Sequence, residues 1–249
     1  MKNITISVVS HNQGSILRNL LKKLDKYSRF IAKVIVTFNT SEKINISSLS
    51  FSYEVVCIQN SKSKGFAENH NQAFMKCQSE FFCVMNPDID LNIEPFENLI
   101  KCFKDSSVCV VAPQIKSLDG IVEDSARYFP TIGSIMKKKI FGYRGIFPIG
   151  NDAVIVYPDW IGGMFLLFDS IKYRNLNGFD ERYFLYYEDV DLCLRAWKEG
   201  YKVILSLDVD VIHDARRTSH KNIKYMKWHI TSMIRFFILH IGRFPNKVL

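Results

Sequence analysis

Two carboxylates, Asp88 and Asp90, stand two residues apart within residues 86–90, directly after the apolar run of residues 81–85. Carboxylate oxygens are the hard ligands that Mg²⁺ and Mn²⁺ prefer, and Pro87 restricts the turn that would aim them. A cation held there could stabilise the negative charge that builds on a departing diphosphate. Asn, Asp and Pro are also the ordinary residues of turns, so a plain loop is the alternative interpretation.

A second acidic cluster stands at the start of a predicted helix at residues 189–199. Acidic residues favour helix N-termini, and Glu188, Asp191 and Arg195 fall on one helical stripe, so salt bridges explain part of the cluster. Asp189 falls off that stripe. A group transfer with inversion needs one carboxylate to take the proton of the acceptor. Asp189 is the candidate for this base, with Glu188 as its supporting neighbour.

His213 follows the apolar run of residues 209–212 directly. A lone histidine is usually structural, but a neutral imidazole is also a good ligand for Mn²⁺-like metals. Its place at the end of a strand, in the same half of the chain as the acidic cluster, favours the role of a metal ligand.

The elements that would position these residues alternate along the chain between short apolar runs and segments in which apolar residues recur at helical spacing. Strands are predicted at residues 4–9, 33–38, 54–58, 81–85, 108–112, 164–168 and 201–205, and helices at residues 16–24, 66–77, 96–103 and 189–199. Strands that are apolar on both faces and alternate with helices predict an α/β fold with a mostly parallel sheet covered on both sides. Gly200 is expected to end the last of these helices. Residues 114–159 are rich in Gly, Pro and Lys and predict an irregular, mobile loop region.

Polar residues follow the predicted strands. Ser10, His11 and Asn12 come after the first strand, and Asn39 comes after the second. Sheets of this class bind ligands outside the carboxyl ends of their strands. These residues and the segment at residues 86–90 are therefore the candidates for a ligand site, although Asn, Asp, Ser and Pro are also the ordinary residues of loops.

The composition is that of a folded protein of 249 residues with a formal net charge of +8. This charge favours anionic partners, but no zinc-finger spacing and no aromatic pattern of an RNA-binding sheet is present, so a nucleic-acid partner is not expected. The six cysteines form no CxxC pair, which is typical of a reduced, cytoplasmic protein. No apolar run approaches the ~20 residues that span a bilayer.

Together, these residues resemble the family 2 glycosyltransferases of the GT-A fold, in particular the bacterial rhamnosyltransferases of O-antigen and cell-wall glycan assembly. The matching segments stand in the family's order at residues 8–12, 65–71, 85–88, 159–163, 177–180 and 183–195, followed by His213. The resemblance extends over roughly residues 4–240. It implies a Rossmann-like, mostly parallel sheet with flanking helices and a C-terminal helical segment.

The resemblance also implies roles for particular residues. Asp88 is expected to be the metal-binding carboxylate, joined by His213 and in a secondary role by Asp90, with Mg²⁺ or Mn²⁺ as the cofactor. Trp160 and Gly163 are expected to border the acceptor and sugar pocket. The nucleotide-sugar donor is expected to contact Ser10, His11, Asn12, Asn39, Gly65, Asn71 and Asn86.

Two departures from the family's pattern bear on the donor. Many relatives have an Asp before the asparagine that follows the second strand, where it reaches the nucleobase, and here Phe38 stands in that place. The metal motif begins with Asn86 in place of an aspartate, as in the rhamnosyltransferase branch. Gly65 is expected to let the backbone approach the nucleotide closely.

The implied activity is that of an inverting, metal-dependent glycosyltransferase. It is expected to transfer L-rhamnose from dTDP-L-rhamnose to a hydroxyl of a lipid-linked or growing oligosaccharide in surface polysaccharide synthesis, of the O-antigen or lipopolysaccharide kind. UDP-galactose or UDP-N-acetylglucosamine is the alternative donor. A nucleotidyltransferase would show a Gly-rich basic loop, and residues 7–17 hold only Gly14. A catalytically inactive glycan-binding protein is the alternative of another class, and the retained Asp88, Asp189 and His213 count against it.

The expected organisation is a GT-A domain at residues 1–220, with a nucleotide-sugar half at about 1–112 and an acceptor half at about 113–220. Residues 221–249 are expected to form a basic amphipathic helix that belongs to the same unit. In residues 223–243 apolar side chains recur at spacings of three or four, with Lys and Arg between them. This pattern predicts either a core helix docked on the sheet or a helix that lies on an anionic membrane surface. The expected location is cytoplasmic, peripheral on the inner face of the bacterial plasma membrane.

Overall fold

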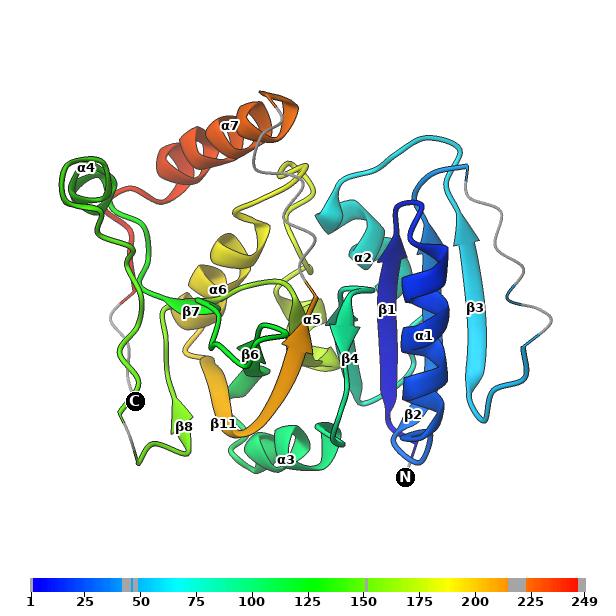
Figure 1. Cartoon of the computed structure of the whole chain (residues 1–249). Coiled ribbons are helices and arrows are strands. Elements are labelled where there is room, and N and C mark those ends of the chain that lie inside the picture. Colours follow the sequence, from blue (N-terminus) through cyan, green and yellow to red (C-terminus); the bar gives the residue numbers. More distant parts are fainter. Residues whose placement is uncertain (1, 42–45, 47–48, 151, 215–222, 246–249) are drawn as a thin grey trace.

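The structure is a computed structural model that describes residues 2–41, 46, 49–150, 152–214 and 223–245. Its strands are β1 (Ile4–Ser10), β2 (Ile31–Phe38), β3 (Glu54–Gln59), β4 (Phe81–Met85), β5 (Ile89–Asp90), β6 (Val108–Lys116), β7 (Ala126–Arg127), β8 (Ile155–Val156), β9 (Trp160–Ile161), β10 (Phe165–Asp169) and β11 (Lys202–His213). In this part of the chain a nine-stranded sheet has the order β3-β2-β1-β4-β10-β6-β11-β5, with β8 paired beside β11 (Figure 1). A two-stranded sheet pairs β7 with β9.

Helices cover both faces of the large sheet, as the sequence predicts. They are α1 (Gly14–Asp25), α2 (Phe66–Phe74), α3 (Phe96–Lys101), α4 (Ile132–Phe141), α5 (Ser170–Asn175), α6 (Glu188–Lys198) and α7 (Ile223–His240), with a 3₁₀ turn at Cys102–Lys104. Successive side chains of a strand point to opposite faces, so Phe82 and Val84 pack in one core and Cys83 and Met85 in the other. The first core includes buried residues of α2, α5, α6 and α7, and the second includes those of α1 and α3.

Parallel pairing aligns the carboxyl ends of four neighbouring strands. Phe38 of β2 is in register with Ser10 of β1 and with Gln59 of β3, and Met85 of β4 is in register with Val8 of β1. The polar residues that follow these strands therefore emerge at one edge of the sheet, where ligands of such sheets bind.

Strand β10 departs from the parallel pattern. It runs antiparallel to both of its neighbours, β4 and β6, with Phe165 opposite Met85. Because the chain enters β10 at the carboxyl end of β4, residues 163–164 lie beside the turn that follows β4. The inserted strand thereby adds a second loop to the edge at which the parallel strands end.

The segment at residues 114–159 is more ordered than the sequence predicts, because β6 extends to Lys116 and α4 forms within it. Thr131 and Ser134 cap α4 reciprocally. The N–H of Ser134 donates to Thr131 Oγ1 at 3.0 Å, and the N–H of Thr131 donates to Ser134 Oγ at 2.8 Å. This pair lacks the Glu or Gln of the usual capping box, so the sequence pattern did not mark the start of the helix.

Strand β11 joins two apolar runs that the sequence presents as separate, at residues 201–205 and 209–212. A register irregularity between Ser206 and Asp210 lets the strand continue along β6. Gly200, at φ 75°, follows the end of α6, as predicted for a left-handed C-terminal residue. The long strand brings its last residues to the edge of the sheet.

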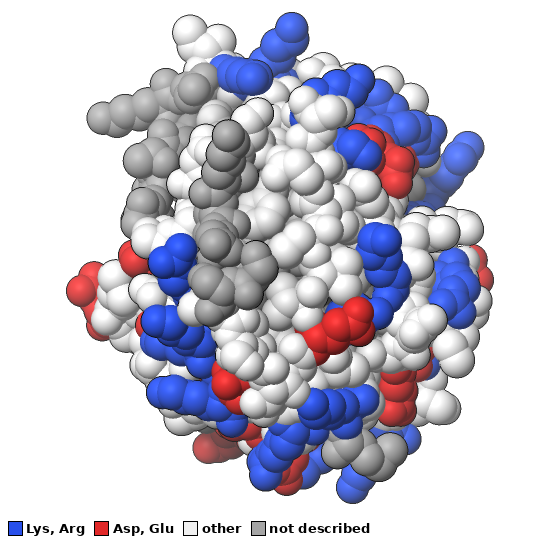
Figure 2. Space-filling view, turned by 90° about the vertical axis from the view of Figure 1, so that its right-hand side faces the viewer, with Lys and Arg blue, Asp and Glu red and all other residues white. Residues whose placement is uncertain are grey.

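Helix α7 lies within the predicted residues 223–243, and the predicted boundary between residues 220 and 221 falls outside the described residues. Among the described residues, no helix has the length and apolar character needed to cross a bilayer. Figure 2 shows the face that borders β3, where Lys and Arg side chains cover more of the surface than Asp and Glu do.

Candidate active site

The turn that carries Asp88 is held between β4 and the chain that enters β10. The N–H of Asn86 donates to the carbonyl oxygen of Met164 at 2.9 Å, and the N–H of Ile89 donates back to the carbonyl of Asn86 at 3.2 Å. The N–H of Asp214 donates to the carbonyl of Asp88 at 3.0 Å. Backbone hydrogen bonds to two other segments therefore fix the backbone of the turn that carries Asp88.

Asp88 and His213 face each other across the pairing of β5 with β11. His213 Nε2 lies 3.4 Å from Asp88 Oδ1, and His213 Nδ1 lies 3.0 Å from Glu123 Oε2. Burial lowers the pKa of His213, but hydrogen bonding and charge from Asp88 and Glu123 outweigh it, so the pKa stands above its ordinary value. Apart from this long 3.4 Å contact with the imidazole, Asp88 Oδ1 is buried without a hydrogen-bond partner among the described residues.

This arrangement fits a divalent cation held jointly by protein and diphosphate. A buried carboxylate oxygen without a well-formed hydrogen bond is costly unless a ligand satisfies it, and an imidazole nitrogen lies 3.4 Å away. The Glu123 carboxylate fixes the other ring nitrogen, as carboxylates behind metal-binding histidines do. The described residues contain no group of three or more His, Cys, Asp or Glu side chains that could hold a metal alone. Mg²⁺ sites often use one or two carboxylates and take substrate phosphates for the rest.

Asp90 is paired elsewhere in the structure, and its expected secondary role at a metal stays a prediction. Its carboxylate forms an ion pair with Lys23 of α1. Asp90 lies opposite Ile212 in the pairing of β5 with β11, one position beyond the pair formed by Ile89 and His213. The carboxylate thus has a structural partner on a neighbouring helix.

Asp189 is held against the loop that precedes β10. Its Oδ2 accepts a hydrogen bond from the N–H of Gly163 at 3.1 Å, and its Oδ1 accepts one from the N–H of Val190 at 2.9 Å. Burial raises the pKa of Asp189, while these hydrogen bonds and the charge of Arg127 oppose the rise. A Cβ at Gly163 would lie 3.1 Å from the ring of Phe66, so the backbone approaches the carboxylate where a side chain has little room.

Glu188 is the buried neighbour of Asp189. Its side chain is almost fully buried, and its Oε2 has no hydrogen-bond partner. Burial and the charge of Asp189 raise the pKa of Glu188 well above its ordinary value. Two neighbouring carboxyls, one buried and one partly buried, resist ionising together, and Asp189 accepts hydrogen bonds that favour its charged form. Of the two side chains, Asp189 is therefore the one whose charged form the surroundings favour.

Two consecutive tyrosines turn the chain into α6. Tyr186 and Tyr187 have φ values of 69° and 70°, in the left-handed region that bulky residues rarely adopt. The ring centroids of Tyr186 and Tyr187 lie 5.4 Å and 5.5 Å from that of His229. Strained backbone of this kind concentrates at functional sites. Here it places Glu188 and Asp189 at the start of the helix.

Asp189 and His213 line two separate cavities that share two arginines. A cavity of about 270 Å³ is lined by Asp189, Glu188 and Trp160, among others, and one of about 900 Å³ by residues that include His213. Arg127 and Arg144 line both cavities and form ion pairs with Asp124, which lines the larger one. The indole N–H of Trp160 donates to the carbonyl oxygen of Tyr128 at 2.9 Å, which holds the ring at the smaller cavity. The predicted base, its neighbour Gly163 and Trp160 are thus brought together.

The predicted nucleotide residues after β1 and β2 also meet. Asn39 is fully buried, and its Nδ2 lies 3.1 Å from His11 Nε2. The hydroxyl of Thr40 donates to Asn12 Oδ1 at 3.1 Å, and the N–H of Asn39 donates to the carbonyl of Ser10 at 3.0 Å. These contacts tie the ends of the two strands into one surface.

The side-chain amide of Asn39 forms its hydrogen bonds within the protein and so holds the loops that form this surface. Its Nδ2 donates to the carbonyl of Lys64 at 2.8 Å, and its Oδ1 accepts from the N–H of Lys64 and from Asn60 Nδ2, each at 2.8 Å. Asn60 also donates to Asn69 Oδ1 at 2.7 Å. Sequence reasoning missed Asn60, although an Asn directly after a strand was the signal that selected Asn39.

Gly65 and Asn71 make close contacts within the protein, and their expected contacts to the donor stay predictions. A Cβ at Gly65 would lie 2.6 Å from the carbonyl oxygen of Phe184, so the close approach there is to backbone. Asn71 Oδ1 accepts from the hydroxyl of Tyr173 and the N–H of Phe179, and its Nδ2 donates to the carbonyl of Phe179. Both residues position the chain that leads to α6.

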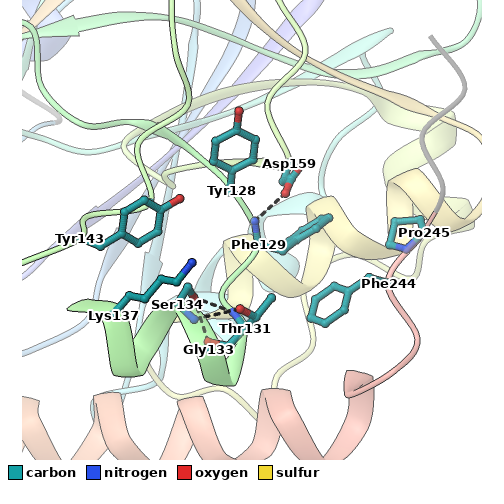
Figure 3. A pocket seen from close by; sticks show the side chains of 11 residues that line it. Tyr128, Phe129, Thr131, Gly133, Ser134, Lys137, Tyr143, Asp159, Phe244 and Pro245 are labelled. Carbon is teal, nitrogen blue, oxygen red and sulfur yellow. Dashed lines mark hydrogen bonds between the residues drawn. The ribbon is translucent and has the colours of Figure 1, made fainter. Parts of the chain in front are cut away.

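A third cavity, of about 590 Å³, adjoins the Asp189 cavity, and Tyr128, Ser134, Tyr143 and Gly145 line both. Figure 3 shows aromatic rings around it and Lys137 of α4 reaching toward it. The two cavities together therefore offer more room beside Asp189 than its own cavity alone.

Three charged residues at the site were missed by sequence reasoning: Glu123, Arg127 and Arg144. All three lie within residues 114–159, where no periodic pattern predicts an element. Their charge was visible in the sequence, but nothing local indicates that Glu123 meets His213, which is 90 residues away.

Comparisons with known sequences agree with this geometry. The sequence model of the family described as glycosyl transferase family 2 matches residues 5–171. Rhamnosyltransferase WbbL of Escherichia coli (strain K12) is 26% identical over 250 residues, which cover 94% of this chain and 92% of that protein. N-acetylglucosaminyl-diphospho-decaprenol L-rhamnosyltransferase of Mycobacterium tuberculosis (strain ATCC 25618 / H37Rv) is 28% identical over 146 residues, 54% of this chain and 47% of that protein.

Solved glycosyltransferases share the fold. The crystal structure of GalNAc-T7 with UDP, GalNAc and Mn²⁺ superposes with a TM-score of 0.71 at 12% identity, covering 96% of this chain and 48% of that one. Mannosyltransferase PcManGT from Pyrobaculum calidifontis, in complex with GDP-Man and Mn²⁺, superposes with a TM-score of 0.63 at 15% identity. The superposition covers 94% of this chain and 64% of that one. The chain thus spans about half the length of the GalNAc-T7 structure and about two thirds of the PcManGT structure. The fold is GT-A. Because the family model matches more than half of its length, the chain belongs to glycosyl transferase family 2.

Proposed function

We propose that this glycosyltransferase is an inverting, metal-dependent enzyme that transfers L-rhamnose from dTDP-L-rhamnose to a hydroxyl of a lipid-linked or growing oligosaccharide. The observation that carries the proposal is the partly buried Asp189 carboxylate, fixed by Gly163 beside a cavity that shares two arginines with the cavity lined by His213. The names of the two relatives support rhamnose as the sugar.

In the proposed reaction, Asp189 takes the proton of the acceptor hydroxyl while the acceptor oxygen attacks the anomeric carbon of the donor sugar. The bond from that carbon to the diphosphate oxygen breaks on the opposite face, so the configuration inverts. The nucleoside diphosphate leaves with the bonding electrons. Glu188 keeps its proton, which leaves the negative charge on Asp189.

The negative charge of the donor would meet Asp88, His213 and the two arginines. Asp88 and His213 would hold a divalent cation, whose chemistry is to stabilise charge on the departing diphosphate. Glu123 would keep the His213 ring in place. Arg127 and Arg144 line both cavities and supply positive charge between them.

The alternative donor is a UDP-sugar, galactose or N-acetylglucosamine. Two observations bear on it. Phe38, where many relatives carry an Asp, is buried and offers the nucleobase no polar group. The structures of GalNAc-T7 and of TarS from S. aureus were solved with UDP or UDP-GlcNAc. Ser10, His11, Asn12 and Asn86 remain in the proposed donor site under either alternative.

We also propose that the enzyme acts in surface polysaccharide synthesis of the O-antigen kind, at the cytoplasmic face of the bacterial plasma membrane. A lipid-linked acceptor would be met there. The nucleotide-sugar half at about residues 1–112 and the acceptor half at about 113–220 stay predictions, as does the inclusion of residues 221–249 in the same unit.

A donor panel tests the proposal. The purified protein is incubated with Mg²⁺ or Mn²⁺, a prenyl-diphosphate-linked N-acetylglucosamine acceptor, and dTDP-L-rhamnose, UDP-galactose or UDP-N-acetylglucosamine in turn. We expect dTDP release with dTDP-L-rhamnose, and NMR of the product should show inverted anomeric configuration. Release only with a UDP-sugar would select the alternative donor. Glycan binding without release from any donor would favour an inactive binding protein.

A further inference from the structure

Helix α7 has two distinct faces, and its inner face is docked on the protein. Phe236 is fully buried, and the hydroxyl of Ser232 donates to the carbonyl of Leu185 at 2.9 Å. His240 Nε2 lies 2.7 Å from Asp191 Oδ1 on α6. These residues are spaced four apart and fix the helix in one orientation.

The outer face of α7 is apolar and exposed. Ile223 and Ile238 are 77% and 74% exposed, and the members of the face recur at spacings of three or four, as one helical stripe requires. They are Ile223, Met226, Ile230, Ile234, Ile238 and Ile241. A contiguous exposed apolar face of this kind marks an interaction surface.

Helix α4 carries a second exposed apolar stripe. Ile132, Met136 and Ile140 are spaced four apart and are exposed, and Phe141 at the end of the helix is 79% exposed. Figure 1 shows α4 and α7 at the same end of the molecule. Ser134 and Ile135 of α4 and His229 and Met233 of α7 line the cavity that holds Asp189. The two helices with exposed apolar faces are therefore walls of the candidate acceptor cavity.

The charge of these segments has one sign. Residues 132–149 and 223–245 contain no Asp or Glu, although the chain has 25 acidic residues. Lys224 and Lys227 are exposed on α7, and the Lys224 ammonium lies 4.9 Å from the ring of Trp228. That ring stacks on Phe184 at 4.6 Å. Apolar, cationic and aromatic side chains together are typical of helices that lie at the surface of an anionic bilayer.

We propose that the outer faces of α4 and α7 form one docking surface for an anionic lipid bilayer, which holds the Asp189 cavity at the bilayer surface. A second copy of the chain fits less well, because a symmetric pair would bring the same acid-free, basic segments together. The docking surface stands on its own observations. Its use for a lipid-linked acceptor rests on the proposed function.

The test is flotation of the full chain with vesicles of phosphatidylcholine alone or mixed with phosphatidylglycerol. We expect binding to the mixed vesicles at low salt, release at high salt, and little binding to phosphatidylcholine. Ile234→Glu combined with Ile238→Glu should lower the bound fraction roughly tenfold or more. Ile171→Glu, at a 66% exposed isoleucine on α5, is the matched control and should bind as the wild type does.

Lys224→Gln combined with Lys227→Gln keeps the apolar face and should weaken binding to anionic vesicles only. Thermal unfolding of each variant checks that the fold is kept. Absence of wild-type binding to anionic vesicles at low salt would overturn the proposal. The proposal would also be overturned if light scattering showed a dimer that Ile234→Glu dissociates while vesicle binding stays unchanged. Vesicle binding without sugar transfer would keep the docking surface and remove the proposed function instead.

Discussion

The backbone N–H of Gly163 donates a hydrogen bond to Asp189 Oδ2 across 3.1 Å, and so joins the loop before β10 to the start of α6. The next residue, Met164, accepts a hydrogen bond from the N–H of Asn86. A two-residue stretch of backbone thus touches both the proposed base and the turn that carries Asp88. The antiparallel insertion of β10 creates this link, because it brings the loop to the edge where the parallel strands end.

Asp189→Asn should lower kcat by about 10²–10⁴-fold, because the amide cannot take the acceptor proton. The KM for the donor should stay nearly unchanged, since the proposed donor contacts lie elsewhere. Steady-state kinetics of nucleoside diphosphate release measure both. Asp191→Asn, on the same helix, is the control and should mainly lower stability, because Asp191 pairs with Arg195 and His240. An Asp189→Asn enzyme within a few-fold of wild type, with Glu188→Gln inactive, would move the role to Glu188.

Asp88→Asn should abolish metal-dependent turnover, whereas Asp90→Asn should not. Asp88 offers a buried oxygen without a well-formed hydrogen bond, while Asp90 is paired with Lys23. The Lys23 pair is about one-third exposed, so its loss should cost no more than about 1 kcal/mol of unfolding free energy. Activity titrated with Mn²⁺ after chelation compares the two variants. Full activity in excess EDTA, or equal losses in both variants, would contradict the proposed metal set.

Glu123→Gln should weaken metal affinity by roughly 10–100-fold, the usual cost of losing the carboxylate behind a histidine ligand. Glu123 acts through His213, whose Nδ1 it holds at 3.0 Å, and is a positioning residue. The concentration of Mn²⁺ that gives half-maximal activity should rise, while activity at saturating Mn²⁺ recovers. A uniform loss of kcat that excess metal does not repair would show that Glu123 has a different role.

The pH profile should carry an acidic limb above the ordinary aspartate range. A base works only when deprotonated, and burial raises the pKa of Asp189, so kcat/KM should fall as pH falls through this raised pKa. Arg127 opposes the rise, so Arg127→Gln should move the limb to higher pH. Profiles of kcat/KM for both enzymes test this. A limb that stays in place in Arg127→Gln would remove the electrostatic link between the two residues.

Much of the site could be predicted from residue types at strand ends. Asp88, His213 and Asn39 each follow an apolar run, and alignment of strands in a sheet brings such positions to one edge. Helical spacing distinguished Asp189 from its acidic neighbours, because Asp189 does not lie on the helical stripe formed by Glu188, Asp191 and Arg195. Local sequence patterns suffice where position along a strand or helix determines which side a residue faces.

The remaining features depend on partners far along the chain. Asp90 pairs with Lys23, and Gly65 packs against the backbone of Phe184, which no local pattern indicates. The apolar spacing of residues 223–243 allowed either a core helix or a surface helix. The structure shows that the helix has both an inner docked face and an outer apolar face. The two apolar stripes could not be told apart in the sequence, because both recur at the same helical spacing.

Asn71 provides a last prediction, because the sequence and the structure give it different roles. The resemblance to the family places it at the donor, but its side chain bridges α2 to the segment before α6. Its Oδ1 accepts from the Tyr173 hydroxyl at 2.8 Å and the Phe179 N–H at 3.0 Å. Its Nδ2 donates to the Phe179 carbonyl at 2.8 Å and to Glu181 at 3.0 Å. Every hydrogen-bonding position of the amide is therefore in use within the protein.

Asn71→Ala should lower the free energy of unfolding by roughly 1–3 kcal/mol, because it leaves polar groups of Tyr173 and Phe179 without their partner. Donor affinity, measured by titration with dTDP at a temperature where both proteins are folded, should change little. Gln72→Ala is the matched control on the same helix, since Gln72 accepts a single hydrogen bond from Lys64 at 3.2 Å, and should be nearly neutral. If Asn71→Ala instead kept its stability and bound dTDP much more weakly, Asn71 would be a donor ligand, and its hydrogen bonds within the fold would be secondary to that role.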